Sequence, residues 1–524
     1  MRRTLPSPRR PAALAAVTAL AALGSLGLST AASQAKDIVW ARYGDIDTLD
    51  PHRATSTLSL QVWSLVYDTL LATDKDGKPV PHIAKSWTSS PDGKEYTFTL
   101  QDGVTCHDGS PLNAEDVKYT VERAFDASNP SVTKASWGPI TSAEVVDPLT
   151  VKLKLDKPFV ALIPFLADSF SSIICDSNKG VPGFGTTAAI GSGPWKLTSW
   201  TKGDKIVLAR NPSYKNFGKL AENKGAPYMD GLVIATVPEP QARLAGLKTG
   251  AIQIAEPPLD DVPALKTSGE LGIVIAQNTG QNVFWEFAAH RPPFNDVRAR
   301  KAVAYATDAA AAIDLVYGDL SIPEKCPISR GVFGNDQEFC AAHGQTYDPQ
   351  KAKAILSELG YGPGKPLEVT LIVWTGGKRD KLAEVFQNQL AEVGIKAKIE
   401  IMDIGTMNAR VRQENEKTSG VGTMDMMTWS WYDPDILYAL WHSPGAYRGY
   451  TTPELDAMLE KTRVLTNEAE RLKAVQDVMA HLLENAVHVP LYTPGWEWVF
   501  AVRPEVKGFK VAPFVYPIFS DVKF

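Results

Sequence analysis

A strand–helix–strand unit between residues 367 and 401 constrains the fold more than any other feature of this sequence. Residues 367–374 predict a buried strand, and residues 380–393 carry apolar side chains at helical spacing. Alternation over residues 397–401 predicts a second strand, and Gly394 stands where a helix C-cap belongs. Strands joined through a helix pair in parallel with a right-handed crossover, so this half of the chain is expected to be α/β.

The first half of the chain mixes strands and helices without long parallel repeats. Apolar and polar residues alternate over residues 94–100, directly after the turn dipeptide Asp92-Gly93, which predicts a half-buried strand. Asn113 is placed to cap a helix with one apolar face, and residues 151–155 alternate again. Together with the second half, these patterns predict an α/β protein.

The length of the chain requires more than one hydrophobic core. It has 524 residues, and single cores stop growing near about 250–300 residues. Lys and Arg number 54 against 59 Asp and Glu, a formal charge of −5, which argues against a basic nucleic-acid binder. A charged fraction of 22% and a hydrophobic fraction of 44% favour an ordered globular protein.

The first 35 residues have the pattern of a secretory signal peptide. Four arginines precede an apolar run from Ala12 to Leu28, and Ser33 and Ala35 occupy the −3 and −1 positions, so the mature chain is expected to begin at Lys36. The run is shorter than the roughly 20 residues that span a membrane, and no cysteine lies nearby to carry a lipid anchor. Removal of the four arginines leaves 50 basic against 59 acidic residues, a charge of −9.

The four cysteines of an exported chain favour disulfides over metal ligation. They are Cys106, Cys175, Cys326 and Cys340, and no CxxC spacing is present. Cys326 and Cys340 enclose a short loop that contains Gly and Pro, so we favour the pairs Cys326–Cys340 and Cys106–Cys175. Three pairings are possible, and the sequence alone does not choose among them.

The motifs of hydrolases, metalloenzymes and phosphate-binding proteins are missing from the sequence. It contains no GxSxG, HExxH or GxxxxGK[ST], so we expect no catalytic residue, metal or cofactor. A carboxylate pair assembled from distant segments would not appear in such a search, and a secreted hydrolase therefore stays an alternative.

Several characteristic sequence strings run in order through nearly all of the mature chain. They are Thr48-Leu-Asp-Pro51, Pro81-His-Ile-Ala-Lys-Ser-Trp87, Pro91-Asp-Gly-Lys-Glu-Tyr-Thr-Phe-Thr-Leu100, Cys106-His-Asp-Gly-Ser-Pro-Leu-Asn-Ala-Glu-Asp-Val117, Gly193-Pro-Trp-Lys-Leu197, Arg210-Asn-Pro-Ser-Tyr214 and Pro293-Phe-Asn-Asp-Val-Arg298. Together they resemble the signature of family 5 extracellular solute-binding proteins, the dipeptide- and oligopeptide-binding receptors of ABC importers. Most of these strings are turn dipeptides and helix starts, so they identify the fold and say little about the ligand.

The resemblance implies the two-lobed periplasmic-binding-protein fold (type II, cluster C) with an extra inserted subdomain. Lobe I would comprise residues 36–60, 191–277 and 490–524, with the inserted subdomain over residues 61–190. Lobe II would comprise residues 278–489. The chain would cross twice between the lobes, and a ligand that touches both lobes would stabilise the closed state.

The candidate ligand-binding residues are gathered in lobe II around Trp429, Trp431, Tyr432 and Asp433. In peptide-binding relatives this region resembles a Trp followed by an aspartate that pairs with the ligand's α-ammonium, ahead of a Pro. The present segment is shorter, and Asp433 aligns better with a different position. Trp429 and Trp431 would face the same side of a strand, where flat aromatic faces suit peptide side chains and sugar rings alike.

Four further residues are weaker candidates for ligand contact. Arg379 lies in a loop that faces the cleft in relatives and would meet a carboxylate or phosphate. Gln281 and Trp285 lie on the expected crossover into lobe II, and Tyr67 lies early in the inserted region.

These observations predict a periplasmic, non-catalytic receptor of an ABC importer. We expect it to be a monomer that captures a small polar solute, with a peptide as the family default, and delivers it to the membrane permease. A non-peptide solute, such as an opine, an amino-acid conjugate or an oligosaccharide, is the alternative within the same class.

Overall fold

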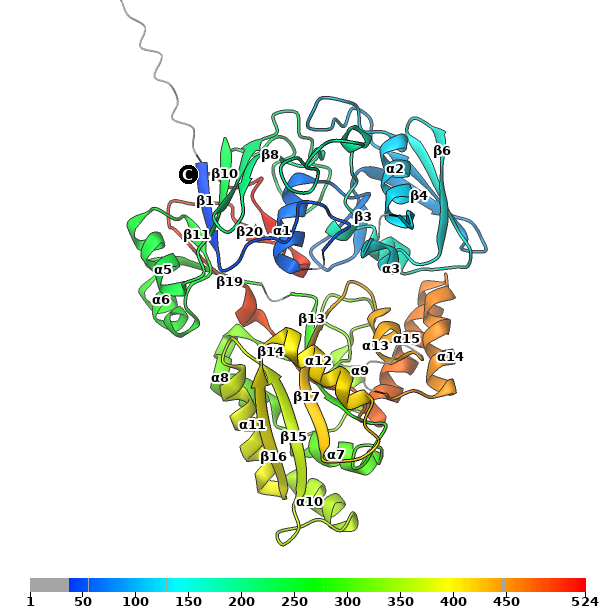
Figure 1. The fold of residues 1–524 in the computed structure, drawn as a ribbon, viewed down its shortest axis with the longest axis vertical. Coiled ribbons are helices and arrows are strands. Elements are labelled where there is room, and N and C mark those ends of the chain that lie inside the picture. The colour runs from blue at the N-terminus through cyan, green and yellow to red at the C-terminus, as the bar shows by residue number, and fades with distance from the viewer. Residues whose placement is uncertain (1–36, 55, 129–130, 277, 444–448) are drawn as a thin grey trace, which may run out of the picture. The chain divides into compact units, whose positions relative to one another are not determined.

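The computed structural model describes residues 37–54, 56–128, 131–276, 278–443 and 449–524 (Figure 1). The expected signal peptide and its cleavage site lie outside these residues. No helix in the described ranges is both long and apolar enough to span a membrane.

The first sheet has seven strands in the order β12-β19-β11-β1-β10-β9-β8. Their bounds are β1 Asp37–Arg42, β8 Trp195–Thr201, β9 Lys205–Arg210, β10 Gly231–Thr236, β11 Ile254–Ala255, β12 Gly272–Ile275 and β19 Val499–Val502, and the accompanying helices are α1 Thr57–Val66, α5 Pro240–Thr249 and α6 Val262–Ser268. β1 pairs in parallel with β10, with Asp37 opposite Gly231. Buried Trp40, Trp195 and Phe500 belong to the core formed on this sheet.

A four-stranded antiparallel sheet in the order β4-β5-β7-β6 forms a second core within the first half of the chain. The elements of this region are β2 Leu71–Thr73, β3 Pro79–Pro81, β4 Ala84–Ser89, β5 Glu95–Leu100, α2 Ala114–Phe125, α3 Thr133–Ser136, β6 Ile140–Asp147, β7 Thr150–Leu155 and α4 Leu162–Phe165. The strand expected over residues 94–100 is confirmed as β5. Asn113 caps α2 by accepting from the backbone N–H of Glu115 at 2.8 Å.

The second large sheet has six strands in the order β14-β18-β13-β17-β15-β16. Its strands are β13 Gln281–Phe287, β14 Ile322–Pro323, β15 Leu367–Trp374, β16 Ile395–Met402, β17 Gly422–Ser430 and β18 Val489–Thr493. The helices of this region are α7 Val297–Ala306, α8 Ala309–Tyr317, α9 Gln337–His343, α10 Pro349–Glu358, α11 Arg379–Val393, α12 Ile404–Asn415, α13 Ile436–Trp441, α14 Pro453–Val464 and α15 Glu468–Glu484.

The remaining regular elements are short. They are strands β20 Lys510–Val511 and β21 Pro517–Ile518, and 3₁₀ turns over Ser169–Ser171, Asp176–Asn178, Leu259–Asp261, Gly318–Leu320, Gly495–Trp498 and Pro513–Val515.

The predicted strand–helix–strand unit is present as β15-α11-β16. The two strands pair in parallel from Leu367 opposite Ile395 to Trp374 opposite Met402. Gly394 ends α11 in the left-handed conformation, at φ 94°, which glycine adopts without the steric cost that a Cβ atom brings. The α/β class expected from this unit is confirmed.

The sheet pairing moves two of the expected lobe boundaries by a few residues. The chain passes between the large sheets after β12 and again after β18. Because β18 pairs with β13, the second sheet extends to Thr493, and the expected return at residue 490 falls too early. The expected start of the insertion at residue 61 falls inside α1, whose buried face packs into the core of the first sheet.

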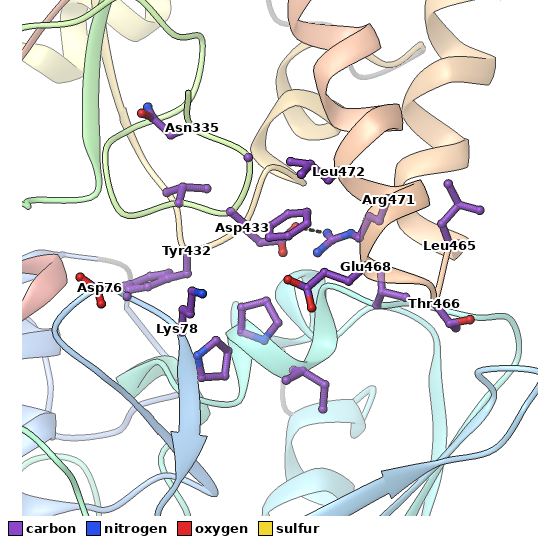
Figure 2. A pocket seen from close by; sticks show the side chains of 18 of the residues that line it. Asp76, Lys78, Asn335, Tyr432, Asp433, Leu465, Thr466, Glu468, Arg471 and Leu472 are labelled. Atoms are coloured by element: carbon purple, nitrogen blue, oxygen red, sulfur yellow. Dashed lines mark hydrogen bonds and ion pairs between the residues drawn. The ribbon is translucent and has the colours of Figure 1, made fainter. Parts of the chain in front are cut away.

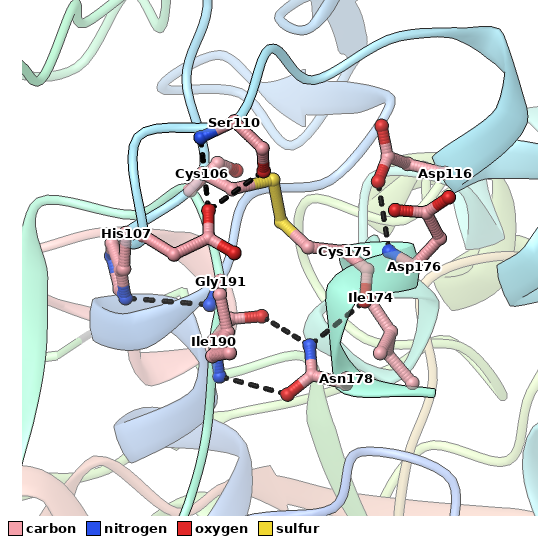
Figure 3. The surroundings of a disulfide bond; sticks show 12 residues. Cys106, His107, Ser110, Asp116, Ile174, Cys175, Asp176, Asn178, Ile190 and Gly191 are labelled. Atoms are coloured by element: carbon pink, nitrogen blue, oxygen red, sulfur yellow. Dashed lines mark hydrogen bonds between the residues drawn. A yellow bond between two sulfur atoms is a disulfide. The ribbon is translucent and has the colours of Figure 1, made fainter. Parts of the chain in front are cut away.

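Both favoured disulfides are present. Cys106–Cys175 joins segments 69 residues apart, and Cys326–Cys340 joins segments 14 residues apart. Around the first disulfide, Asp116 accepts from the backbone N–H of Asp176 at 2.8 Å, and Asn178 exchanges hydrogen bonds with the backbone of Ile190 (Figure 3). A carboxylate oxygen of Asp116 lies within 4.8 Å of both sulfur atoms. The sulfurs are bonded to each other, so this cluster is structural.

Candidate ligand-binding site

A cavity of about 1130 Å³ lies between the four-stranded sheet with its β2–β3 hairpin and segments around the second large sheet (Figure 2). We call it the interlobe cavity. From the first half of the chain it is lined by residues 76–79, 87–89, Tyr96, Val160, Ile163 and Pro164. From the second half it is lined by residues 331–336, Tyr432, Asp433, Leu465, Thr466, Glu468, Arg471, Leu472 and Gln476.

The hairpin and the 331–336 loop approach each other through two glycines. Gly77 has φ +80°, and a Cβ atom built there would lie 2.5 Å from the carbonyl oxygen of Gly331. Gly331 also has positive φ, and a Cβ atom on it would collide with the side chain of Asn278. A side chain at Gly77 would force the hairpin away from the 331–336 loop, and one at Gly331 would displace Asn278, so the two glycines allow the close approach.

Asp433 lines the cavity but is engaged in an internal ion pair. Its Oδ1 lies 2.6 Å from Nη2 of Arg471 and also accepts from the backbone N–H of Asp435 at 2.9 Å. Arg471 is held in place by donating from Nε to the carbonyl of Thr462 at 3.1 Å. The carboxylate of Asp433 is 1% exposed. A ligand ammonium at Asp433 would have to compete with a buried arginine.

Tyr432 lines the cavity and contacts two residues of the C-terminal segment. Its hydroxyl lies 2.8 Å from that of Tyr516, and its ring centroid is 4.1 Å from that of Phe514. Tyr516 in turn donates to Oδ1 of Asp168 at 3.1 Å and accepts from Ser169 at 3.0 Å. Burial raises the pKa of Asp168 to about 7. Tyr432 therefore joins a hydrogen-bond chain between the two halves of the protein.

Trp429 and Trp431 lie beside the interlobe cavity. Both line a small space of about 10 Å³ together with Gly280, Phe284 and His488. Trp429 belongs to β17, whereas Trp431 follows the end of that strand and packs edge-on against Phe165 with centroids 5.6 Å apart. The two rings share one small cavity, which is nearly filled by protein atoms in this conformation.

Arg379 and Gln281 meet around Glu497, on the second chain crossing. Arg379 forms an ion pair with Glu497, and its guanidinium carbon lies 3.4 Å from the ring centroid of Trp374. Gln281 donates to Glu497 at 3.1 Å and accepts from Trp498 at 2.8 Å. Burial raises the pKa of Glu497, and the charge of Arg379 opposes that rise. The predicted anion-binding arginine is thus neutralised by a carboxylate of its own chain.

Trp285 and Tyr67 are core residues in this structure, because their side chains are enclosed by protein. Trp285 is 0% exposed, packs on Phe386 with centroids 4.9 Å apart and donates to Thr307. Tyr67 is 2% exposed and donates to the carbonyl of Leu49 at 2.9 Å. Neither side chain lines the interlobe cavity in this conformation, and ligand contact from these two residues stays a prediction. Apolar residues recur at the same spacing along a strand or helix whether its apolar face lies in a core or in the wall of a cleft.

Of the eight candidate residues, only Tyr432 and Asp433 line the interlobe cavity. The sequence patterns did not indicate the rest of its lining, which comes from the β2–β3 hairpin, β4, β5 and the segments around residues 160–164, 331–336 and 465–476. Gly331 and Gly334 mark a turn-rich segment, and Thr466 and Asn467 mark a helix start, yet neither signal indicates a cavity.

Comparison with known proteins gives the same fold and identifies the family. Residues 78–448 match the bacterial extracellular solute-binding proteins, family 5 (middle region). The chain belongs to this family.

Among its relatives, the glutathione-binding protein GsiB of Salmonella typhi is 31% identical over 409 residues, which are 76% of each chain. Among solved structures, the ABC transporter substrate-binding protein CtaP of Listeria monocytogenes superimposes with a TM-score of 0.81 at 23% identity, covering 94% of this chain and 99% of that one. The periplasmic binding protein DppA of Helicobacter pylori, in complex with the peptide STSA, has a TM-score of 0.72 at 25% identity, covering 93% and 98%. The fold is therefore the two-lobed α/β fold of this family.

Proposed function

We propose that this family 5 protein is the exported receptor of an ABC importer and that it captures a peptide in the interlobe cavity. The observation that carries the proposal is a cavity of about 1130 Å³ lined by segments from both halves of the chain. This volume lies slightly above the roughly 300–1,000 Å³ of small-molecule sites, which suits a ligand of several residues. Relatives named for glutathione and solved with a tetrapeptide support the same class of ligand.

The mechanism follows from the position of the cavity. A ligand that touches both walls binds the closed conformation more tightly than the open one, and this difference in affinity drives closure. The membrane permease would then recognise the closed surface and accept the ligand. We propose that the protein acts as a monomer in the periplasm, after cleavage behind Ala35, with neither lipid anchor nor catalytic role.

Native mass spectrometry of the secreted protein tests the proposal. We expect a mature chain beginning at Lys36 and a co-purified peptide that is released unchanged on denaturation. A peptide present at 100 times its dissociation constant should raise the free energy of unfolding by about 2.7 kcal/mol. Conversion of the released ligand into a product would contradict a receptor role and favour a hydrolase.

A non-peptide solute is the second candidate, and one observation favours it. Asp433, the only carboxylate between Trp429 and Pro434, is already paired with Arg471 at 2.6 Å. An opine, an amino-acid conjugate or an oligosaccharide would not need that carboxylate. Recovery of such a compound, together with no binding of peptides, would decide for this alternative.

A further inference from the structure

The charged side chains that line the interlobe cavity differ in whether a protein partner neutralises them. Asp433 and Arg471 form their own pair. Asp76 pairs with its neighbour Lys75 at 2.8 Å. Asp336 accepts from two backbone N–H groups at the start of α9, each at 3.0 Å.

Two oppositely charged residues of the lining, Lys78 and Glu468, differ from these three cases. Lys78 and Glu468 form no ion pair or side-chain hydrogen bond with other residues of the described ranges, and both are exposed. Lys78 extends from the β2–β3 hairpin, and Glu468 extends from the first turn of α15. Figure 2 shows their side chains entering the cavity from its hairpin side and its helical side.

The surface near these charges is apolar and aromatic. Trp87, Ile163 and Val332 line the cavity, and the ring of Phe333 lies 5.3 Å from the guanidinium carbon of Arg471. A site with a few polar groups on an apolar surface orients its ligand through those groups and gains affinity from the apolar contacts.

We propose that Glu468 binds the N-terminal ammonium of a short peptide and that Lys78 binds its C-terminal carboxylate, while the apolar wall holds the side chains. This inference rests on the proposed function and assigns to Glu468 the amine contact that Asp433 cannot make while it is paired with Arg471. Because the hairpin carries Lys78 and α15 carries Glu468, a peptide with both ends free would bridge the two walls and favour closure.

Competition between peptide mixtures tests the assignment. The probes are an equimolar mixture of tripeptides with free ends, the same mixture N-acetylated, and the same mixture C-amidated, with retention measured by native mass spectrometry. We expect the wild type to retain free peptides about tenfold better than either blocked mixture. Glu468→Gln should abolish discrimination against acetylated peptides only, and Lys78→Gln should abolish discrimination against amidated peptides only.

Matched controls separate this effect from a general change in charge. Glu470→Gln on the same helix turn and Lys85→Gln on β4 lie outside the cavity lining and should leave both preferences unchanged. If Glu468→Gln and Lys78→Gln lost free and blocked peptides equally, the assignment of the two residues would be wrong, while the proposed function would stand. The same conclusion would follow if the control variants lost the preference for free peptides. A wild type that retains no peptide from any mixture would overturn the proposed function as well.

Discussion

Asp433 and Arg471 form a buried ion pair, with 2.6 Å between Oδ1 and Nη2, in the wall of the interlobe cavity. One partner comes from the segment after β17 and the other from α15, so the pair holds a loop against a helix. Its carboxylate lies in the segment where peptide-binding relatives carry an amine-binding aspartate, although Asp433 aligns better with a different position, and its pairing with the arginine gives it a structural role.

The first prediction concerns this pair. Arg471→Gln leaves the carboxylate of Asp433 buried without its counter-charge, so the free energy of unfolding should fall by about 3–5 kcal/mol in urea titrations. The double variant Asp433→Asn with Arg471→Gln should recover most of that loss, because neither charge is then buried alone. Asp433→Asn by itself should leave the preference for free over acetylated peptides intact. A selective loss of amine-bearing ligands in that variant would return Asp433 to the ligand site.

The cluster around Glu497 gives the second prediction. Arg379→Gln should lower the free energy of unfolding by about 3–5 kcal/mol, because the buried carboxyl group of Glu497 would lose its counter-charge. Glu497→Gln should cost less, since an amide can keep the hydrogen bond with Gln281. Arg379→Lys keeps the charge but loses the planar stacking on Trp374, so we expect an intermediate loss. If all three variants unfolded with the same free energy as the wild type, a structural role for the Arg379–Glu497 pair would be contradicted.

The third prediction is a pH dependence that involves Asp168. Burial raises the pKa of this carboxyl group from 3.8 to about 7 in the folded protein. The folded state therefore holds the proton more tightly than the unfolded state, and this contribution to stability is lost as the pH rises from about 4 to about 7. Asp168→Asn keeps the site neutral, so its stability relative to the wild type should increase over that range and then level off.

Thermal unfolding of both proteins at matched pH values measures this difference. Other groups titrate over the same range, among them Asp435, whose pKa burial raises to about 6, but their contributions cancel in the comparison. A difference between wild type and variant that does not change with pH would rule out the assigned titration.

The disulfides give the fourth prediction. In the chain-entropy account, closing a loop of 69 residues stabilises by about 4 kcal/mol and closing one of 14 residues by about 3 kcal/mol. Replacing Cys106 and Cys175 by alanine should therefore cost more than replacing Cys326 and Cys340. Urea titration of each double variant, with the reduced wild type as a reference, checks the order. The reverse order would mean that native packing, rather than loop length, dominates.

Local sequence patterns predicted the elements whose pairing is nearly local. The unit β15-α11-β16 follows from periodicity and a C-cap glycine, because its strands and helix are joined by short loops. The same holds for β5 and for the capped start of α2. The boundary at residue 490 was misplaced because the membership of β18 in the second sheet depends on pairing with a strand about 200 residues earlier.

What the sequence by itself determined is the α/β class, the need for more than one core and the family, because each rests on local spacing, on chain length or on resemblance along the chain. Only the tertiary structure decided which charges are available to a ligand. Asp433 and Arg379 are engaged in ion pairs with Arg471 and Glu497, partners 38 and 118 residues away, whereas Lys78 and Glu468 line one cavity from opposite halves of the chain. Ion pairing depends on distance in space, and sequence separation carries no measure of that distance.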